Sequence, residues 1–187
     1  MAICQTSLVG TIDHGLLLHQ QPSSFLKALS NASWGADPDD RKSTTGFCIY
    51  FDTNLISWST HKQEIVSRSN REVEYKVVAV VMTEILWLKS LLHELHIQTP
   101  DPQIFSNNLD PVFLRENPVM HSKYKHFELD LHFVRDNVQN HLVQLVHIPG
   151  RFQVVDPLTN LVFDPTFIRV KHTLKVAPNR TMSLRGC

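Results

Sequence analysis

The chain has 187 residues, of which 42% are hydrophobic and 19% charged, and lysine plus arginine and aspartate plus glutamate number 18 each. This composition suits one domain with a hydrophobic core, and the longest apolar run, residues 77–82, is far shorter than the roughly 20 residues of a membrane-spanning helix. Because the formal net charge is zero, the composition argues against a protein that binds nucleic acid strongly through overall charge.

The N-terminal residues and the cysteines bear on location. Residues 1–10 contain neither the basic segment nor the long apolar segment of a signal peptide. The cysteines, Cys4, Cys48 and Cys187, are odd in number, and their spacing matches no disulfide framework and no zinc motif. We therefore expect reduced thiols in an intracellular protein without a membrane segment, and its compartment stays open.

The first half of the chain predicts an antiparallel sheet. Residues 1–24 are interpreted as a lead-in, with turn-forming residues at 10–15. Three segments rich in apolar, β-branched or aromatic residues follow, and short polar turns such as residues 37–40 separate them. The predicted strands are residues 25–34, 45–51 and 55–60. Consecutive strands with short connections are typical of an antiparallel meander.

A long amphipathic helix is predicted next. Apolar residues recur with helical spacing between Glu72 and Leu95. Ser69 and Glu72 have the spacing of a capping box, in which each side chain binds the other residue's backbone N–H. The apolar stripe that we expect to face the sheet comprises Tyr75, Val78, Met82, Ile85, Leu86 and Leu92.

The second half of the chain alternates shorter strands and helices. Strands are predicted at residues 103–106 and 141–148, and helices are predicted to open at 107–111, to span 127–138, to start near 153 and to span 166–176. The whole order predicts an α/β fold whose sheet mixes an antiparallel meander with parallel strands. In such sheets, ligands bind at the carboxyl ends of the strands.

Several fragments, in one order along the chain, carry a family resemblance. They are residues 29–34 (LSNASW), 37–46 (DPDDRKSTTG), 72–75 (EVEY), 84–88 (EILWL), 125–130 (KHFELD) and 147–149 (HIP), followed by Asp156. Together they resemble the ribonuclease H domain of copia-type retrotransposon Pol polyproteins. The resemblance extends over residues 9–176, nearly the whole chain.

The resemblance implies a ribonuclease H-like domain at residues 25–160, with a mixed five-stranded sheet flanked by helices. Residues 1–24 would then be the remnant of a connection to a reverse transcriptase that this chain lacks, and residues 161–187 a short helix and tail. The implied reaction is hydrolysis of the RNA strand of an RNA–DNA hybrid. In that reaction two Mg²⁺ ions clamp the reacting oxygens, and the family holds them with four carboxylates.

The resemblance also transfers site positions to this chain. Glu74 and Asp156 keep the family's carboxylates, His126 keeps a histidine, and Asn31 and Asn107 stand where the family has aspartates. Four carboxylates would balance the charge of two Mg²⁺ ions, whereas Glu74 and Asp156 alone balance half of it. An asparagine amide carries no charge, and its nitrogen cannot bind a metal. We therefore expect a degenerate, inactive copy in which Mg²⁺ binding is weakened or lost.

Two alternatives stay open. The chain could be a weakly active Mg²⁺-dependent ribonuclease H, or a non-catalytic module that binds nucleic acid or a polymerase. Residues that could contact phosphates are Arg41, Lys42, Arg68 and Arg71. Scattered solvated charges are the plainer interpretation of these four. Trp34, Trp58 and Trp87 could stack on bases, but we expect all three in the core. The oligomeric state is left open.

Overall fold

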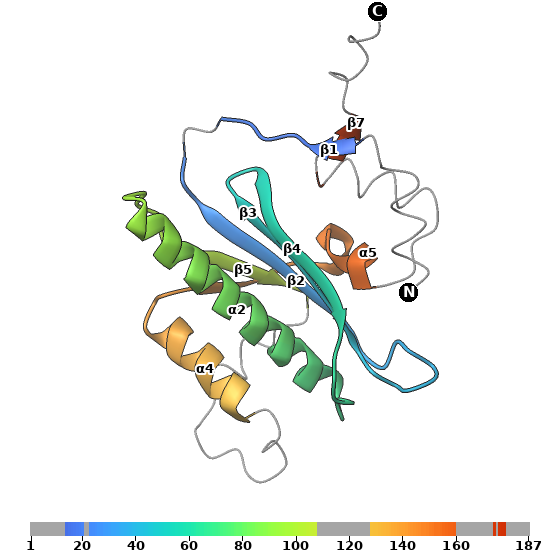
Figure 1. Cartoon of the computed structure of the whole chain (residues 1–187). Helices are drawn as coiled ribbons and strands as arrows, with labels where there is room; N and C mark the ends of the chain where they lie inside the picture. Colours follow the sequence, from blue (N-terminus) through green and yellow to red (C-terminus); the bar gives the residue numbers. More distant parts are fainter. Residues whose placement is uncertain (1–13, 21–22, 108–127, 160–173, 175, 179–187) are drawn as a thin grey trace, which may run out of the picture.

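A mixed five-stranded sheet forms the centre of the computed structural model, which describes residues 14–20, 23–107, 128–159, 174 and 176–178 (Figure 1). Its strands are β2 (Leu26–Ser33), β3 (Thr44–Phe51), β4 (Asn54–Lys62), β5 (Gln103–Ser106) and β6 (Gln144–His147). They lie in the order β4-β3-β2-β5-β6. β2, β3 and β4 are antiparallel, β5 is parallel to β2, and β6 is parallel to β5. The predicted mixed sheet is confirmed.

The sheet is covered on both faces, which explains the apolar centre of β3. Phe47 and Ile49 belong to a core cluster with residues of the long helix α2 (Asn70–Glu94), whereas Cys48 and Tyr50 belong to a second cluster with Val155. A strand buried on both faces is expected to be apolar without alternation. Cys48 is a free cysteine, and burial raises the pKa of its thiol to about 12.

The long helix α2 lies across one face of the sheet, as Figure 1 shows. Its N-cap is Ser69, whose Oγ accepts the N–H of Glu72 at 3.2 Å, so this half of the predicted capping box is confirmed. The Glu72 carboxylate accepts the N–H of Arg68 at 2.8 Å. The predicted apolar stripe is confirmed: Tyr75, Val78, Met82 and Ile85 are buried, and Leu86 and Leu92 pack partly buried against the core.

A second helix, α4 (Glu128–Gln139), packs beside α2 on the same face and confirms the helix predicted at residues 127–138 (Figure 1). The strand predicted at 141–148 is shorter than expected. His141 has a φ of 55° and its N–H binds the Val138 carbonyl, so it belongs to the turn after the helix. No helix of the described residues is both long and apolar enough to cross a membrane.

The opposite face of the sheet carries a short helix, α5 (Asp156–Thr159), preceded by a 3-10 turn, Gly150–Phe152. These two turns replace the single helix that was predicted to start near Gln153. The N–H of Gln153 binds the Gly150 carbonyl at 2.9 Å, which closes the first turn before α5 begins.

A separate two-stranded sheet pairs β1 (His14–Leu16) with β7 (Val176–Pro178), antiparallel. The turn predicted at residues 10–15 is therefore wrong at its end, and the helix predicted at 166–176 is wrong at Val176. Both errors have one cause: these residues form hydrogen bonds to a partner far away in the sequence, which a local pattern does not reveal. Leu174 is a turn residue, and the other residues of both segments lie outside the described residues, as does the helix predicted to open at 107–111 beyond Asn107.

The three tryptophans are exposed, which contradicts their predicted place in the core. Trp34, Trp58 and Trp87 have exposed fractions of 53%, 54% and 56%. Each lies where the fold provides no cover: Trp34 follows the end of β2, Trp58 is on the edge strand β4, and Trp87 is on the outer side of α2. Similar exposure at three unrelated places makes these residues matched controls for one another.

Candidate active site

Two asparagines mark the carboxyl ends of the neighbouring parallel strands β2 and β5. Ser30 and Ser106 are register partners, so Asn31 and Asn107 each follow a paired residue at the same edge of the sheet. Asn31 is buried, with 6% of its surface exposed, and its partner in β3 is Gly46. The sheet changes from antiparallel to parallel pairing at β2, and ligands bind at such switch points in α/β folds.

Two hydrogen bonds from its amide nitrogen hold the Asn31 side chain. Nδ2 donates to Asp156 Oδ1 at 3.1 Å and to Thr159 Oγ1 at 2.8 Å. The Thr159 hydroxyl itself donates to the Asp156 backbone carbonyl at 3.0 Å, so its oxygen accepts from Asn31. An ionised carboxylate has no proton to give, so both partners require a donor. The Asn31 amide is therefore fixed with one N–H group toward Asp156 and the other toward Thr159, and its carbonyl oxygen is turned away.

Close packing of residues 150–159 on the sheet brings Asp156 to Asn31. Buried Gln153 donates from Nε2 to the Ser30 carbonyl at 2.8 Å, which ties this segment to β2. Gly46 of β3 leaves room for α5. A Cβ at Gly46 would lie only 2.8 Å from Thr159 Cγ2 and 3.2 Å from a Val155 methyl carbon. The missing side chain at this position sets the distance between the helix and the sheet.

We expect Gly46→Ala to displace α5 and to weaken the Asn31–Asp156 contact. Overpacking of this kind destabilises by about 1–3 kcal/mol. The matched rescue is Thr159→Ser in the same chain, because serine keeps the hydroxyl that accepts from Asn31 and removes the methyl that meets the new Cβ. Urea unfolding measures both variants. If the double variant is no more stable than Gly46→Ala alone, the close approach of α5 is not the cause.

Glu74 lies in the second turn of α2, which packs against β2. Its side chain is buried, with 6% of its surface exposed. Asn70, one turn earlier, donates from Nδ2 to Glu74 Oε1 at 2.5 Å. Both surviving carboxylates of the predicted site therefore accept a hydrogen bond from an asparagine side chain, Glu74 from Asn70 and Asp156 from Asn31.

The other two predicted site residues are Asn107 and His126. The backbone carbonyl of Asn107 lies 3.0 Å from Nε2 of His147, at the end of the next strand, β6. His126 lies outside the described residues. The convergence of Glu74, Asp156, Asn31 and Asn107 on one centre stays a prediction, with Asn31 and Asp156 in direct contact. Within the described residues, no group of three or more histidine, cysteine, aspartate or glutamate side chains is placed to hold a metal ion.

Comparison with known proteins identifies the relatives of the chain. It is 41% identical over 177 residues, 92% of its length, to the retrovirus-related Pol polyprotein from transposon RE2 of Arabidopsis thaliana. It is 42% identical over 153 residues, 81% of its length, to that from transposon RE1 of the same plant. The chain is a homologue of retrovirus-related Pol polyproteins from transposons. It spans 12% and 10% of the length of these two relatives. No family model matches the chain.

The fold of this Pol homologue is that of ribonuclease H. LC11-RNase H1, isolated from compost by a metagenomic approach, superposes with a TM-score of 0.50 at 16% identity, over 77% of this chain and 99% of that one. The same protein in complex with an RNA/DNA hybrid superposes with a TM-score of 0.50 at 17% identity, over 76% and 99%. The chain is thus a ribonuclease H-like domain related to part of a Pol polyprotein, as the fragments of its sequence predicted.

Sequence reasoning missed several residues that position the site of this ribonuclease H-like domain. They are Gly46, Asn70, Gln153 and Thr159. One of them had a local signal, because Asn70 is spaced one helical turn before Glu74. The others act across sequence separations of more than 100 residues, as in the contact of Asn31 with Thr159. Only the folded register brings such residues together.

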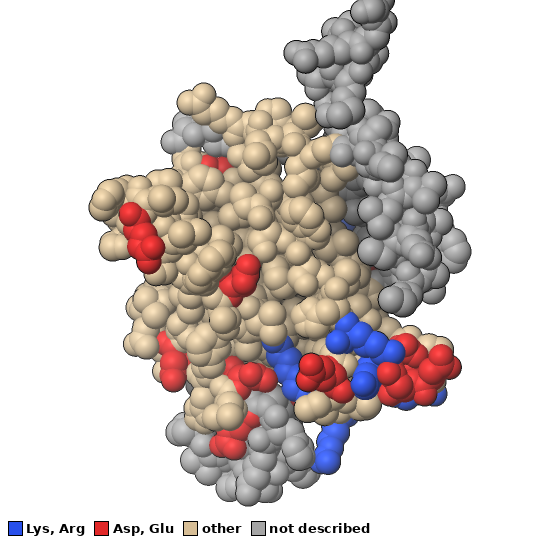
Figure 2. Space-filling view, viewed as in Figure 1, with Lys and Arg blue, Asp and Glu red and all other residues tan. Residues whose placement is uncertain are grey.

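The four residues predicted to contact phosphates lie at one end of the ribonuclease H-like domain. Arg41 and Lys42 are in the connection from β2 to β3, Arg68 precedes the N-cap of α2, and Arg71 is in the first turn of α2. Figure 2 shows lysine and arginine side chains gathered at this end, interleaved with acidic ones. Lys62, for example, contacts Asp37 at 2.5 Å and Asp40 at 2.8 Å. The surface is mixed in charge, and the phosphate contacts stay a prediction.

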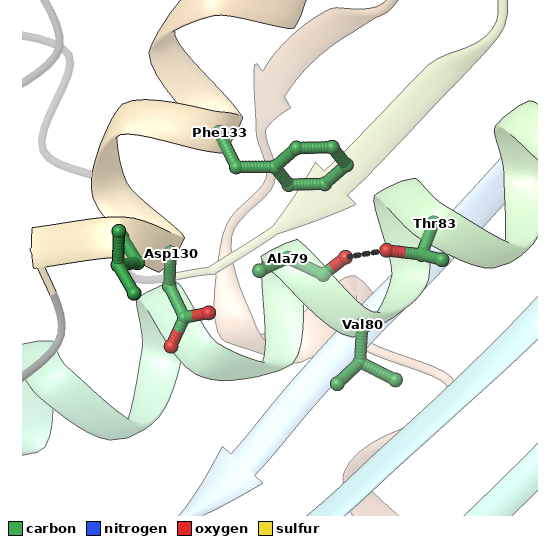
Figure 3. Close-up of a pocket in the computed structure, with 6 residues that line it drawn as sticks. Ala79, Val80, Thr83, Asp130 and Phe133 are labelled. Atoms are coloured by element: carbon green, nitrogen blue, oxygen red, sulfur yellow. Dashed lines mark hydrogen bonds between the residues drawn. The ribbon is translucent and has the colours of Figure 1, made fainter.

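A separate hollow of about 320 Å³ lies between α2 and α4 (Figure 3). Its walls are mostly apolar and include Val80, Phe133 and the exposed Leu129, while the Thr83 hydroxyl bonds the Ala79 carbonyl at 3.0 Å. None of the four predicted site positions, Asn31, Glu74, Asn107 and Asp156, lines this hollow. Among the described residues that line the hollow, Asp130 is the one acidic residue. Burial raises the pKa of the Asp130 carboxyl, and the charge of Lys76 opposes this shift.

We expect Asp130→Asn to make the domain more stable at pH 7. A raised pKa means that the folded chain disfavours the ionised carboxylate, so the destabilisation is absent while Asp130 is protonated and complete above the raised pKa. The advantage of the variant should therefore shrink as the pH falls toward the ordinary value of 3.8. Urea midpoints at a series of pH values measure this difference. A variant that is less stable than the unmodified protein at pH 7 would contradict the prediction.

Proposed function

We propose that this domain is a non-cleaving copy of the ribonuclease H fold, whose former metal site is closed by hydrogen bonds. The observation that carries the proposal is the orientation of the Asn31 amide. A nitrogen that bears two hydrogens lies 3.1 Å from Asp156 Oδ1, where the family's ligand set would place oxygen atoms around a shared cation. The Asn31 N–H group stabilises the negative charge of the Asp156 carboxylate, as a bound cation would otherwise do.

The donor set does not fit two Mg²⁺ ions. To offer its oxygen to a cation, Asn31 would have to turn its amide over and lose both of its hydrogen bonds. A hydrogen bond to a charged group contributes about 1.5–3 kcal/mol. Glu74 and Asp156 also supply only two negative charges for four positive ones. We therefore assign no cleavage step to these residues, in agreement with the degenerate site that the sequence predicts.

The partner that fits this proposal is still nucleic acid, bound weakly. LC11-RNase H1 has been solved in complex with an RNA/DNA hybrid, and the family resemblance implies the same partner class here. Zero net charge provides no long-range attraction to phosphates. Binding must therefore rest on local contacts at the surface.

Titration with Mn²⁺, followed by nuclear magnetic resonance, tests whether the site is closed. Mn²⁺ prefers the same oxygen ligands as Mg²⁺ and broadens the signals of nearby nuclei. The side-chain amide signals of Asn31, identified by their loss in Asn31→Ser, should keep their intensity at millimolar Mn²⁺. The matched control is Asn137, a buried asparagine whose Nδ2 donates to the Phe133 carbonyl at 2.8 Å in α4. Broadening of the Asn31 signals with the Asn137 signals unchanged would overturn the proposal.

A further inference from the structure

Trp34 presents a fixed aromatic face to solvent. Its side chain is 53% exposed, yet its indole N–H donates to the Ser67 carbonyl at 3.1 Å. The bond joins the end of β2 to the segment before α2 and removes the need for another partner of the indole nitrogen. An exposed ring that is already held in place loses little conformational entropy when a ligand stacks on it.

The backbone of Arg41, in the connection from β2 to β3, is held in place as well. Its φ is 57°, a left-handed conformation that a non-glycine residue keeps only where the surrounding structure imposes it. The loop is braced: the Arg41 N–H binds the Asp37 carbonyl at 2.9 Å, and Lys62 forms ion pairs with Asp37 and Asp40. The N–H of Gly35 binds Ser43 Oγ at 3.1 Å on the other side of the loop.

Trp34 and Arg41 line one hollow of about 270 Å³, here called the Trp34 hollow, together with Gly35, Val66 and Ser67. It is large enough for a planar ring system and too small for a folded partner. It lies beyond the carboxyl end of β2, three residues after Asn31, at the end of the molecule where Figure 2 shows the lysine and arginine side chains. A strand that crosses the candidate site would pass close to it.

We infer that the Trp34 hollow binds one unpaired nucleotide of a nucleic-acid strand. A flat aromatic face stacks on any nucleobase, and a guanidinium can contact a phosphate or stack on the base from the other side. A bare phosphate would not use the indole, and a purely apolar ligand would not use Arg41. The inference rests on the nucleic-acid partner of the proposed function, but it does not depend on whether the domain cleaves.

Oligonucleotide binding to the full chain tests this inference, with fluorescence anisotropy at low salt as the measurement. The probes are single-stranded oligothymidylate, a blunt RNA–DNA hybrid and the same hybrid with a single-stranded overhang. We expect the strand and the overhang to bind more tightly than the blunt hybrid, because only they offer an unpaired base. Dissociation constants of about 1–100 µM are typical of contacts without sequence preference at physiological salt, and low salt tightens such binding.

Four tryptophan variants distinguish binding at the Trp34 hollow from binding at any exposed tryptophan. Trp34→Ala should weaken strand binding about 5–150-fold, as expected from a stacking contribution of 1–3 kcal/mol per base. Trp58→Ala and Trp87→Ala remove equally exposed rings elsewhere and should leave the affinity unchanged. Trp34→Phe keeps an aromatic face without the indole N–H and should keep most of the binding.

Arg41→Ala should weaken binding, whereas Lys89→Ala, far along α2, should not.

These binding measurements test the Trp34 hollow whether or not the domain cleaves nucleic acid. The inference would be overturned if the unmodified protein bound no strand at all. It would also be overturned if Trp34→Ala, Trp58→Ala and Trp87→Ala lost affinity equally. A third contradicting result is a blunt hybrid that binds as tightly as the single strand and whose affinity does not change in Trp34→Ala. Trp34→Phe guards against misfolding, because a structural role of the Ser67 contact would make phenylalanine as harmful as alanine. Cleavage is scored in a separate assay, so the two proposals fail independently.

Discussion

In the Asn31→Asp variant we expect a folded domain that needs a divalent cation for its full stability. In the unmodified protein the Asn31 amide donates to Asp156 and Thr159. Aspartate has no N–H to donate, and it places a second negative charge beside Asp156 at a position with 6% exposure. The loss in EDTA should be about 2–4 kcal/mol, because a charged hydrogen bond is replaced by like-charge repulsion. Urea unfolding measures this loss.

Addition of Mg²⁺ or Mn²⁺ should restore most of that stability, because the two carboxylates can then share a cation. Asn137→Asp is the matched control: it changes another buried asparagine, and its loss should be the same with and without the cation. Repulsion within the pair raises the pKa of one carboxyl, so the deficit in EDTA should shrink as the pH falls from 7 toward about 4. A deficit that the cation does not reduce would contradict the account.

The second large effect is expected in the double variant Asn31→Asp plus Asn107→Asp. With Glu74 and Asp156 it brings the site from two negative charges to four, the number that balances two Mg²⁺ ions. We expect isothermal titration to give a Mg²⁺ affinity at least tenfold above that of either single variant, because both ions need their ligands before the pair is stable. If the double variant binds Mg²⁺ no more tightly than Asn31→Asp alone, Asn107 does not belong to the site.

Local patterns predicted most of the fold. The β-branched and aromatic runs predicted β3 and β4, and the spacing from Glu72 to Leu95 predicted α2 with its buried stripe. These elements depend on residues that are neighbours in the sequence. Elements that depend on distant partners were missed, as the pairing of β1 with β7 shows.

The candidate site, like the fold, was predicted only in part from the sequence. Its positions followed from the family resemblance, because Asn31, Glu74 and Asp156 sit in quoted fragments. The direction of the Asn31 amide did not, because it depends on Asp156 and Thr159, which lie more than 120 residues away. The prediction that the three tryptophans are buried was wrong for a related reason. Burial of an aromatic residue depends on which elements cover it, and the sequence alone does not reveal that an edge strand or an outer helix face stays open.

The most direct test of the account is a cleavage assay on the unmodified protein. An end-labelled RNA annealed to DNA is incubated with the full chain in Mg²⁺ and, separately, in Mn²⁺, with Glu74→Gln prepared in parallel to detect a contaminating nuclease. Because an N–H group of Asn31 donates to Asp156 and half of the required charge is missing, we predict no cleavage above the level of Glu74→Gln. Metal-dependent cleavage that Glu74→Gln abolishes would contradict the closed site and show that two carboxylates suffice.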